Sequence, residues 1–337
     1  MLWAFSPSGC DALVDGDSFK DSRPREADSN FHSWDVNSPA DAPPPDLTDT
    51  ALPRQDVDDS AADCGYCGGC LLQPPFGPAQ RMIFMAVGNG GYPGEGVDVD
   101  GNPNTCAPQN DCEDGVNNQL SGLFGLMEQF VSANGELITA VAAGDLNLVL
   151  EWGSFKGGDV AFDLAVHPAI PDLPREDCNW QLEKCNFTIQ AGSLDPETCE
   201  PLVVFRNAVL SNGMITAGGQ DSIFIFGVPL SDSADLKLVM RAARLSGNVI
   251  NGADGPFIVG GLIGGAVRHD DIIATIEQIP ETAYLPVGKE TLITLLNLFV
   301  IPDVDTDGDG QPDAVSIGVK FEARPATISA VSTTVPP

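Results

Sequence analysis

The chain has 337 residues and 43% hydrophobic content, enough for one large domain or two smaller ones around a true core. Its 48 acidic residues outnumber 16 lysines and arginines, which gives a net charge of −32. Such a charge is repelled by nucleic acid and by anionic membrane surfaces, so DNA and RNA are excluded as partners. No apolar run reaches the ~18–20 residues of a membrane-spanning helix.

The N-terminal residues end in Ser8-Gly9-Cys10, which resembles the small-small-Cys cleavage box of bacterial lipoproteins. The resemblance implies that Cys10 carries a lipid and that residues 1–9 are the clipped remnant of a leader. An ordinary cytosolic N-terminus with a stray cysteine is the alternative interpretation.

Residues 10–63 are acidic and rich in proline, with three consecutive prolines at Pro43–Pro45. This composition cannot bury enough apolar surface to offset chain entropy, so the segment is predicted to be disordered. Charged, proline-rich linkers stay extended. We therefore expect a tether that holds a folded domain away from a membrane.

Cysteine usage favours an oxidising compartment. Eight cysteines remain once Cys10 is set aside for lipid, an even number that can close four disulfides of undetermined pairing. The disulfide candidates are Cys64, Cys67, Cys70, Cys106, Cys112, Cys178, Cys185 and Cys199. The alternative is a zinc or iron–sulfur site at Cys64, Cys67 and Cys70 in a cytosolic protein. A ferredoxin-type run would need a fourth cysteine three residues further on, and the next is Cys106.

Residues 64–118 are rich in cysteine, glycine and asparagine and are predicted to be irregular. Within them, Asp98-Val99-Asp100-Gly101-Asn102 has the composition of half a calcium loop. Further oxygen ligands follow, clamped between and just after two cysteines. A second candidate metal site therefore comprises Asp98, Asp100, Asn102, Asp111 and Asp114. Turn chemistry alone is the competing explanation.

From residue 119 the pattern becomes regular and predicts an α+β domain over 119–327. Helical spacing predicts helices at 120–131, 136–143, from Asp270 to Pro280, and at 292–299. Alternation predicts strands at 146–152, 160–166, 202–210, 214–217, 222–228, 235–250, 256–262 and 317–321, with a hairpin turn at Asn212-Gly213. The expected fold is an antiparallel, strand-rich sandwich or open barrel with a few amphipathic helices. Residues 328–337 are expected to form a flexible tail.

Two histidines in this domain are interpreted as structural. His167 and Asp163 fall on the wetter face of the hairpin formed by 146–152 and 160–166, so His167 is expected at the surface. His269, next to two aspartates, is expected to start a helix rather than to form a catalytic dyad.

The most informative stretch is the segment 303–313, which carries five aspartates at alternate or near-alternate positions. Ca²⁺ takes six to eight oxygen ligands, and a curling loop turns alternate side chains inward, with glycine where the backbone needs positive φ. Starting the loop at Asp305 places Gly310 at its sixth position and Ser316 at its twelfth, so the remaining ligands come from elsewhere or from water. The candidate calcium ligands are Asp303, Asp305, Asp307, Asp309 and Asp313, and a solvated acidic loop that binds no ion is the alternative interpretation.

The core Asp-Thr-Asp-Gly-Asp-Gly-Gln-Pro-Asp at 305–313 resembles a thrombospondin type 3 calcium repeat. Together with the Ser-Gly-Cys box, tether and cysteines, the layout resembles uncharacterised secreted bacterial lipoproteins. That resemblance implies a calcium-stabilised, disulfide-bonded protein of the cell exterior or outer envelope, lipid-anchored to the membrane. Its role would be binding or structural, with an unidentified protein or glycan ligand.

Catalysis is not indicated by any familiar motif. The sequence has no His-Glu-x-x-His and no Gly-x-Ser-x-Gly, and no histidine stands beside a plausible cysteine nucleophile. The alternative function is a secreted calcium-dependent hydrolase that uses a carboxylate pair. A deep pocket with two close carboxyl groups of raised pKa would favour that alternative.

Overall fold

The structure is a computed structural model that describes residues 76–108, 114–128, 132–153, 155, 161–195, 197–231, 234–283, 285 and 287–332. Several predictions lie outside these residues: the leader remnant 1–9, the tether 10–63, and the individual positions Cys10, Cys64, Cys67, Cys70, Asp111 and Cys112.

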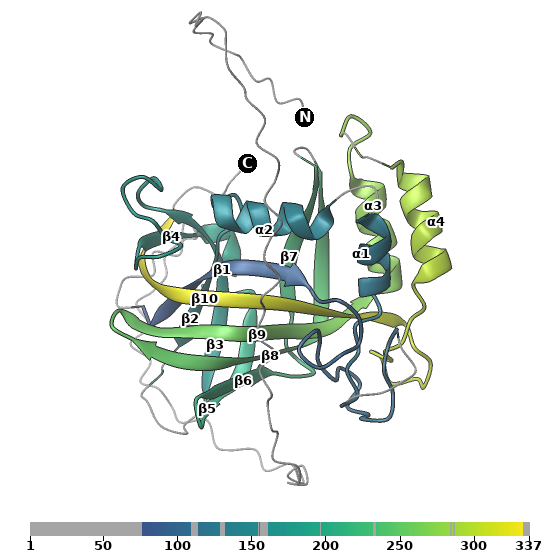
Figure 1. The fold of residues 1–337 in the computed structure, drawn as a ribbon, viewed down its shortest axis with the longest axis horizontal. Coiled ribbons are helices and arrows are strands. Elements are labelled where there is room, and N and C mark those ends of the chain that lie inside the picture. The colour runs from purple at the N-terminus through teal and green to yellow at the C-terminus, as the bar shows by residue number, and fades with distance from the viewer. Residues whose placement is uncertain are drawn as a thin grey trace, which may run out of the picture. The chain divides into compact units, whose positions relative to one another are not determined.

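The described chain forms ten strands and four α-helices (Figure 1). The strands are β1 (Ala79–Val87), β2 (Leu148–Gly153), β3 (Phe162–Pro171), β4 (Asn186–Gln190), β5 (Val204–Ser211), β6 (Met214–Gly218), β7 (Phe224–Ser231), β8 (Ala234–Gly252), β9 (Gly255–Arg268) and β10 (Ala314–Ser332). The helices are α1 (Ser121–Met127), α2 (Ala133–Ala143), α3 (His269–Gln278) and α4 (Lys289–Phe299), with a 3₁₀ turn at Ala191–Ser193.

Eight of these strands close into an antiparallel barrel. The ring runs β1-β2-β3-β5-β6-β8-β9-β10 and returns to β1. β4 joins the outside of the ring, antiparallel to β3 and parallel to β10, and β7 pairs with β8. The predicted strand-rich α+β class is thus confirmed in its barrel form, and this barrel is closed.

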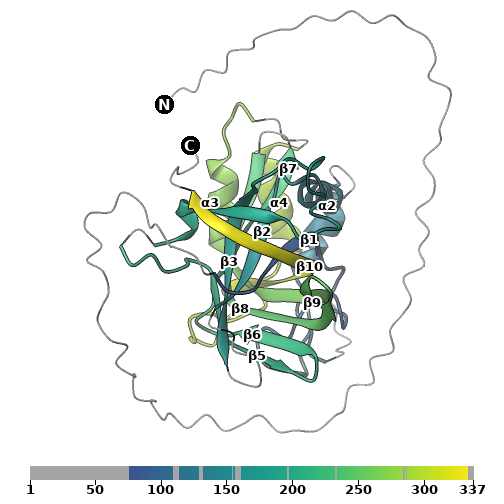
Figure 2. The same cartoon turned by 90° about the vertical axis from the view of Figure 1, so that its left-hand side faces the viewer.

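One main core fills the interior of the ring and continues under the helices. Alternate residues of β10, from Val315 to Ala323, belong to the same buried cluster as residues of all four helices. Helical spacing explains the contacts, because Ile272 and Ile276 of α3 are buried, as are Leu292 and Leu296 of α4. Figure 1 shows α1, α3 and α4 gathered at one end of the long strands, with α2 across the top; Figure 2 shows β5 and β6 at the side opposite the helices.

A second, smaller core lies outside the ring and contains a buried arginine. Arg81 of β1 is 1% exposed; its Nε donates to Asn147 Oδ1 at 2.7 Å and its Nη2 donates to the Val141 carbonyl at 2.5 Å. The guanidinium also lies over the rings of Trp180 and Phe187. Burial, with Arg175 nearby, lowers the pKa of Arg81 to about 10. Arg81 therefore fastens the end of α2 to the barrel.

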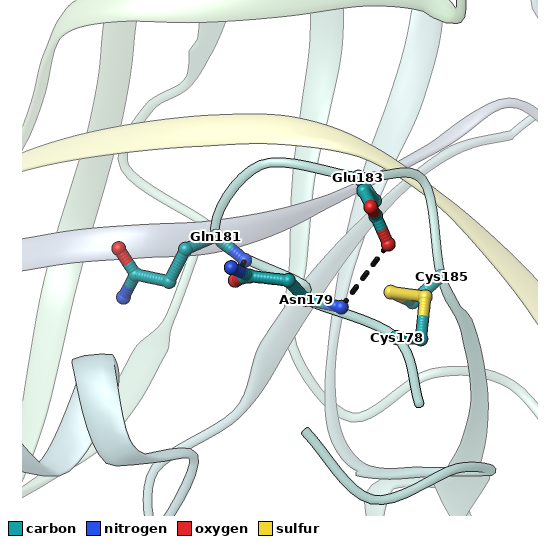
Figure 3. Close-up of a disulfide and its surroundings, with 5 residues drawn as sticks. All are labelled: Cys178, Asn179, Gln181, Glu183 and Cys185. Atoms are coloured by element: carbon teal, nitrogen blue, oxygen red, sulfur yellow. Dashed lines mark hydrogen bonds between the residues drawn. A yellow bond between two sulfur atoms is a disulfide. The ribbon is translucent and has the colours of Figure 1, made fainter. Parts of the chain in front are cut away.

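A disulfide joins Cys178 to Cys185 and closes the loop that covers this second core (Figure 3). Inside the loop the Asn179 N–H donates to Glu183 Oε2 at 3.2 Å. Cys106 and Cys199 are disulfide-bonded as well. All four cysteines in the described part of the chain are therefore oxidised, as the cysteine arithmetic predicted for these positions.

Three sequence predictions need correction. The region 64–118, predicted to be irregular, contains β1, whose alternation is broken by a register shift between Met82 and Phe84. The tail predicted from residue 328 is strand as far as Ser332, because β4 pairs with it. Phe299 is the last residue of the helix predicted at 292–299, and helical spacing places it on the same face as Leu292 and Leu296, but it is 48% exposed.

Glycine at position 318 is required by close packing. A Cβ there would lie 2.5 Å from both the Glu95 carbonyl oxygen and Gly96 Cα, which belong to the loop that crosses β10. We expect Gly318→Ala to lower the free energy of unfolding by about 2 kcal/mol or more, since backbone must move. Gly122→Ala, where a Cβ meets nothing within 4 Å on a helix, is the control and should raise stability slightly. Equal urea midpoints for the two variants would contradict the packing argument.

Removing the 178–185 disulfide should destabilise the second core. In the chain-entropy account, opening a loop of this length costs about 2–3 kcal/mol. We expect the double variant Cys178→Ser, Cys185→Ser to lose about that amount in urea unfolding. Leu182→Ser changes the same loop at a side chain that is 70% exposed, and it should stay within about 0.5 kcal/mol of the parent. A double variant as stable as the parent would show that the bridge constrains nothing.

Candidate metal centre

The aspartate loop connects α4 to β10 and brings three of its five aspartates together. One carboxylate oxygen from each of Asp305, Asp307 and Asp309 lies within 4.8 Å of the other two, and all three residues are exposed. Among the described residues this is the one such group of acidic, histidine or cysteine side chains. An Asp305-Asp307-Asp309 cluster of this size can hold a metal ion.

Local hydrogen bonds explain why the loop curls. Asp305 accepts the N–H of Gly308 at 2.7 Å and that of Gly310 at 2.8 Å, and both glycines have positive φ, +80° and +87°. Asp307 and Asp309 each accept the N–H two residues further on, at 3.1 and 2.7 Å. The N–H groups of Gly310 and Gly308 lower the pKa of Asp305, which keeps this carboxyl ionised.

The other two predicted ligands face protein donors. Asp313 accepts the Thr306 N–H at 2.7 Å and the Thr306 hydroxyl at 2.8 Å, and its Oδ2 lies 3.6 Å from Arg268 Nε. Asp303 accepts the N–H and the hydroxyl of Ser316 at 2.7 and 2.5 Å. Their place in an ion's coordination stays a prediction; in this structure they fasten the two ends of the loop.

Burial raises the pKa of Asp303. Removal from water raises its pKa to about 6, against the opposing effect of the Ser316 hydrogen bonds, and the Asp100 carboxylate adds to the rise. Ser316 itself is fully buried and its hydroxyl accepts the Gln119 N–H at 2.9 Å. The base of the aspartate loop is therefore connected to the start of α1.

Part of the second candidate site lies against the base of the first. Val99 packs in one small core with Val304 and Ala314, which brings the 97–105 turn against the base of the aspartate loop. Asp98 accepts the Gly101 N–H and Asp100 accepts the Asn102 N–H, as turn chemistry dictates. Burial, with the Asp100 side chain beside it, raises the pKa of Asp98.

The remaining residues of the second site add no cluster. Asn102 accepts the Asn104 N–H, and Asp114 is an exposed residue with a φ of +56°. Within the described residues, no three acidic, histidine or cysteine side chains of this set lie close enough together to hold one metal ion. Asp111 lies outside those residues.

Sequence reasoning placed His167 on the surface, and that prediction is wrong. His167 does lie on the face of the β2–β3 hairpin opposite the main core, but it is 1% exposed because the segment carrying Ser193 covers it. His167 Nδ1 is 3.1 Å from Ser193 Oγ, and His167 Nε2 is 3.4 Å from Glu151 Oε2. His269, in contrast, is the first residue of α3, as predicted.

Glu151 was not singled out by any sequence motif, since one glutamate among 48 acidic residues carries no signal. Burial favours its protonated form, but the contact with His167 and the hydrogen bond from the Gly77 N–H outweigh burial and lower the pKa of Glu151. Glu151 is one of the residues that line a cavity of about 450 Å³. A second cavity, of about 380 Å³, is lined by Asp98 and Arg244 among others.

Comparison with known proteins identifies no relative. No protein-family model, curated protein or solved structure matches this chain. The described part of the chain also contains no helix with the length and hydropathy needed to cross a membrane.

The raised pKa of Asp303 predicts a pH-dependent stability in the absence of metal. The folded-state pKa of about 6 lies above the value of 3.8 for a free aspartate, so protonation of Asp303 stabilises the fold. This contribution is complete below about pH 4 and is lost as the pH rises through 6. In EGTA, we expect protonation of Asp303 to add on the order of 1–2 kcal/mol to the stability of the parent when the pH falls from 7 to 4.5. Asp303→Asn should lack this gain.

The control for this experiment is Asp254→Asn, which changes an exposed residue in the β8–β9 turn. Chemical unfolding of the three proteins at several pH values gives the comparison. If the parent and Asp303→Asn show the same pH dependence, Asp303 does not titrate as described.

Proposed function

We propose that this chain is a calcium-stabilised, disulfide-bonded protein of the bacterial cell exterior with a binding or structural role. The observation that carries the proposal is the group of three exposed carboxylates at Asp305, Asp307 and Asp309. Oxygen-only ligands suit a hard cation such as Ca²⁺, which tolerates variable geometry and completes its coordination with backbone oxygens or water. The ion would neutralise charges that otherwise repel one another.

The position of the loop suggests what the ion does. The Val304–Ala314 bridge closes the loop, and Ala314 is the first residue of β10, the strand that pairs with β1 and closes the barrel. An ion held by the loop would therefore stabilise the entry to the closing strand. This gives calcium a structural role.

The proposed location rests on cysteine chemistry. The Cys178–Cys185 disulfide supports an oxidising compartment, as do the oxidised Cys106 and Cys199. Lipid attachment at Cys10, a protein or glycan as the ligand, and an extracellular or outer-envelope position remain parts of the proposal that follow from the sequence resemblance.

In the larger cavity, a hydrolytic role has less support from the residues present. A general acid must be held protonated beside a second carboxylate, whereas the pKa of Glu151 is lowered. The Ser193–His167–Glu151 array does not supply a serine nucleophile either. Ser193 is 6% exposed and its hydroxyl donates to the Gln190 carbonyl at 2.7 Å.

The test is thermal unfolding of the full chain, produced in an oxidising host, with millimolar CaCl₂ against EGTA. Binding to the folded state alone stabilises by about 2.7 kcal/mol at a hundredfold excess over the dissociation constant. We expect a calcium-dependent rise in Tm for the parent, and its loss in Asp307→Ala. Mg²⁺ at the same concentration should give a smaller rise, because it demands strict octahedral geometry.

Asp254→Ala is the matched control, since it removes one exposed carboxylate away from the loop. Its response to calcium should equal that of the parent. An equal response in Asp307→Ala would place the calcium effect elsewhere in the chain, and no response in any of the three proteins would refute the proposal.

A further inference from the structure

The larger cavity is a second feature of the protein and shares no lining residue with the aspartate loop. Its volume of about 450 Å³ lies in the range of small-molecule sites, and β2, β3, β5 and the segment before β5 form its walls. Three acidic residues line it, Glu151, Asp163 and Glu200, beside apolar surface from Ala165, Pro201 and Val204. A charged group and an apolar body can therefore both be accommodated.

The charges in this cavity do not balance. Among the described residues that line the cavity, Arg206 is the only cation, and its Nη1 lies 3.4 Å from Asp163 Oδ2. The Asn207 N–H also donates to Asp163, at 3.2 Å. Glu200 is exposed and forms no ion pair with any of the described residues. The described part of the lining thus carries more negative than positive charge, with Glu151 and Glu200 in excess.

Contacts with two other parts of the protein hold the Glu151 carboxylate in place. Its Oε1 accepts the Gly77 N–H at 2.9 Å, and its Oε2 faces His167 Nε2 across 3.4 Å. His167 is 1% exposed, and its Nε2 has no hydrogen-bond partner of normal geometry. A nearly buried polar ring is thus directed at the carboxylate of Glu151, a residue of the cavity lining. Such backing fixes the orientation of a binding group before any ligand arrives.

We propose that this cavity binds a small organic cation, an amine or guanidinium group on a short apolar body, with Glu151 as its counter-ion. Glu200 supplies a second carboxylate, and Pro201 and Val204 contact the apolar part. Charge-assisted hydrogen bonds to a preorganised carboxylate give selectivity for the cation over a neutral molecule of equal size. A divalent metal fits less well, because the three carboxylates form no metal-sized group and an arginine shares the lining.

The experiment is calorimetric titration of the full chain at pH 7 in EGTA, which keeps the aspartate loop free of calcium. The probes are 2-phenylethylamine and 2-phenylethanol, which have the same size and differ in charge. We expect the amine to bind with a dissociation constant at least roughly tenfold lower than the alcohol. Because no calcium is present, the outcome does not depend on the proposed metal site.

Two variants assign the binding to the cavity. Glu200→Gln alters an exposed side chain with no ion pair among the described residues, so it should fold as the parent does and weaken amine binding severalfold. Glu151→Gln should weaken it by roughly tenfold or more. Glu197→Gln, an exposed neighbour outside the lining, is the charge-matched control and should leave binding unchanged.

The proposal is overturned if the amine and the alcohol bind equally or neither binds. It is equally overturned if Glu200→Gln retains the parent's affinity for the amine. A final titration with CaCl₂ alone, in place of EGTA and amine, distinguishes the ligand classes. If Ca²⁺ binds the parent but not Glu200→Gln, and the amine binds neither protein, the cavity is a metal site. That result would refute the proposal of an organic cation as the ligand.

Discussion

The closure of β10 on β1 is the constraint on which the rest of the structure depends. β10 pairs antiparallel with β1 on one side and with β9 on the other, and its far end adds β4 in parallel. A closed ring leaves no free edge among its eight strands, so the backbone groups are paired within the molecule. The same closure creates the interior that the four helices help to cover, and it fixes the strand ends from which the loops project.

The acidic loop and the cavity use this framework differently. The loop precedes β10 and concentrates carboxylates at the surface, where a cation can offset their repulsion. The cavity is built on the outer face of β2 and β3, where the segment after β4, which carries Ser193, covers His167. As proposed, an ion in the loop would act on the stability of the framework, and the cavity would use the framework as a rigid wall for recognition. For a chain of net charge −32, both features favour cationic ligands.

Short-range patterns in the sequence predicted most elements of the fold. Asn212 and Gly213 form the predicted hairpin turn with positive φ, α2 ends at Gly144 in the left-handed conformation, and α3 carries the predicted buried isoleucines. The sequence did not predict strand β1, because Gln80 and Arg81 are polar residues that become buried only through partners far along the chain, such as Asn147. The sequence pattern does not show that polar residues within a short apolar run are buried, because their burial depends on tertiary contacts.

The candidate sites show the same contrast between local features, which the sequence predicts, and contacts between distant segments, which it does not. The aspartate triplet is local, so spacing alone identified Asp305, Asp307 and Asp309, whereas the partners of Asp303 and Asp313 depend on how the loop closes. Glu151 and His167 belong to different strands, and the cover over His167 comes from a third segment. Alternation could place His167 on a face of the hairpin, but it could not show that this face is buried.

The pairing of β1 with β10 also has a consequence for how the chain folds. Ala79 pairs with Ala326, so the ring closes between residues that lie at opposite ends of the described chain. Contacts of such high sequence separation are associated with slow folding, because loop-closure entropy is lost before the contacts form. During synthesis, β1 must wait for almost the entire chain before its second neighbour exists. Until then its edge and the unfinished interior stay exposed, and this interval is the period of greatest risk of aggregation.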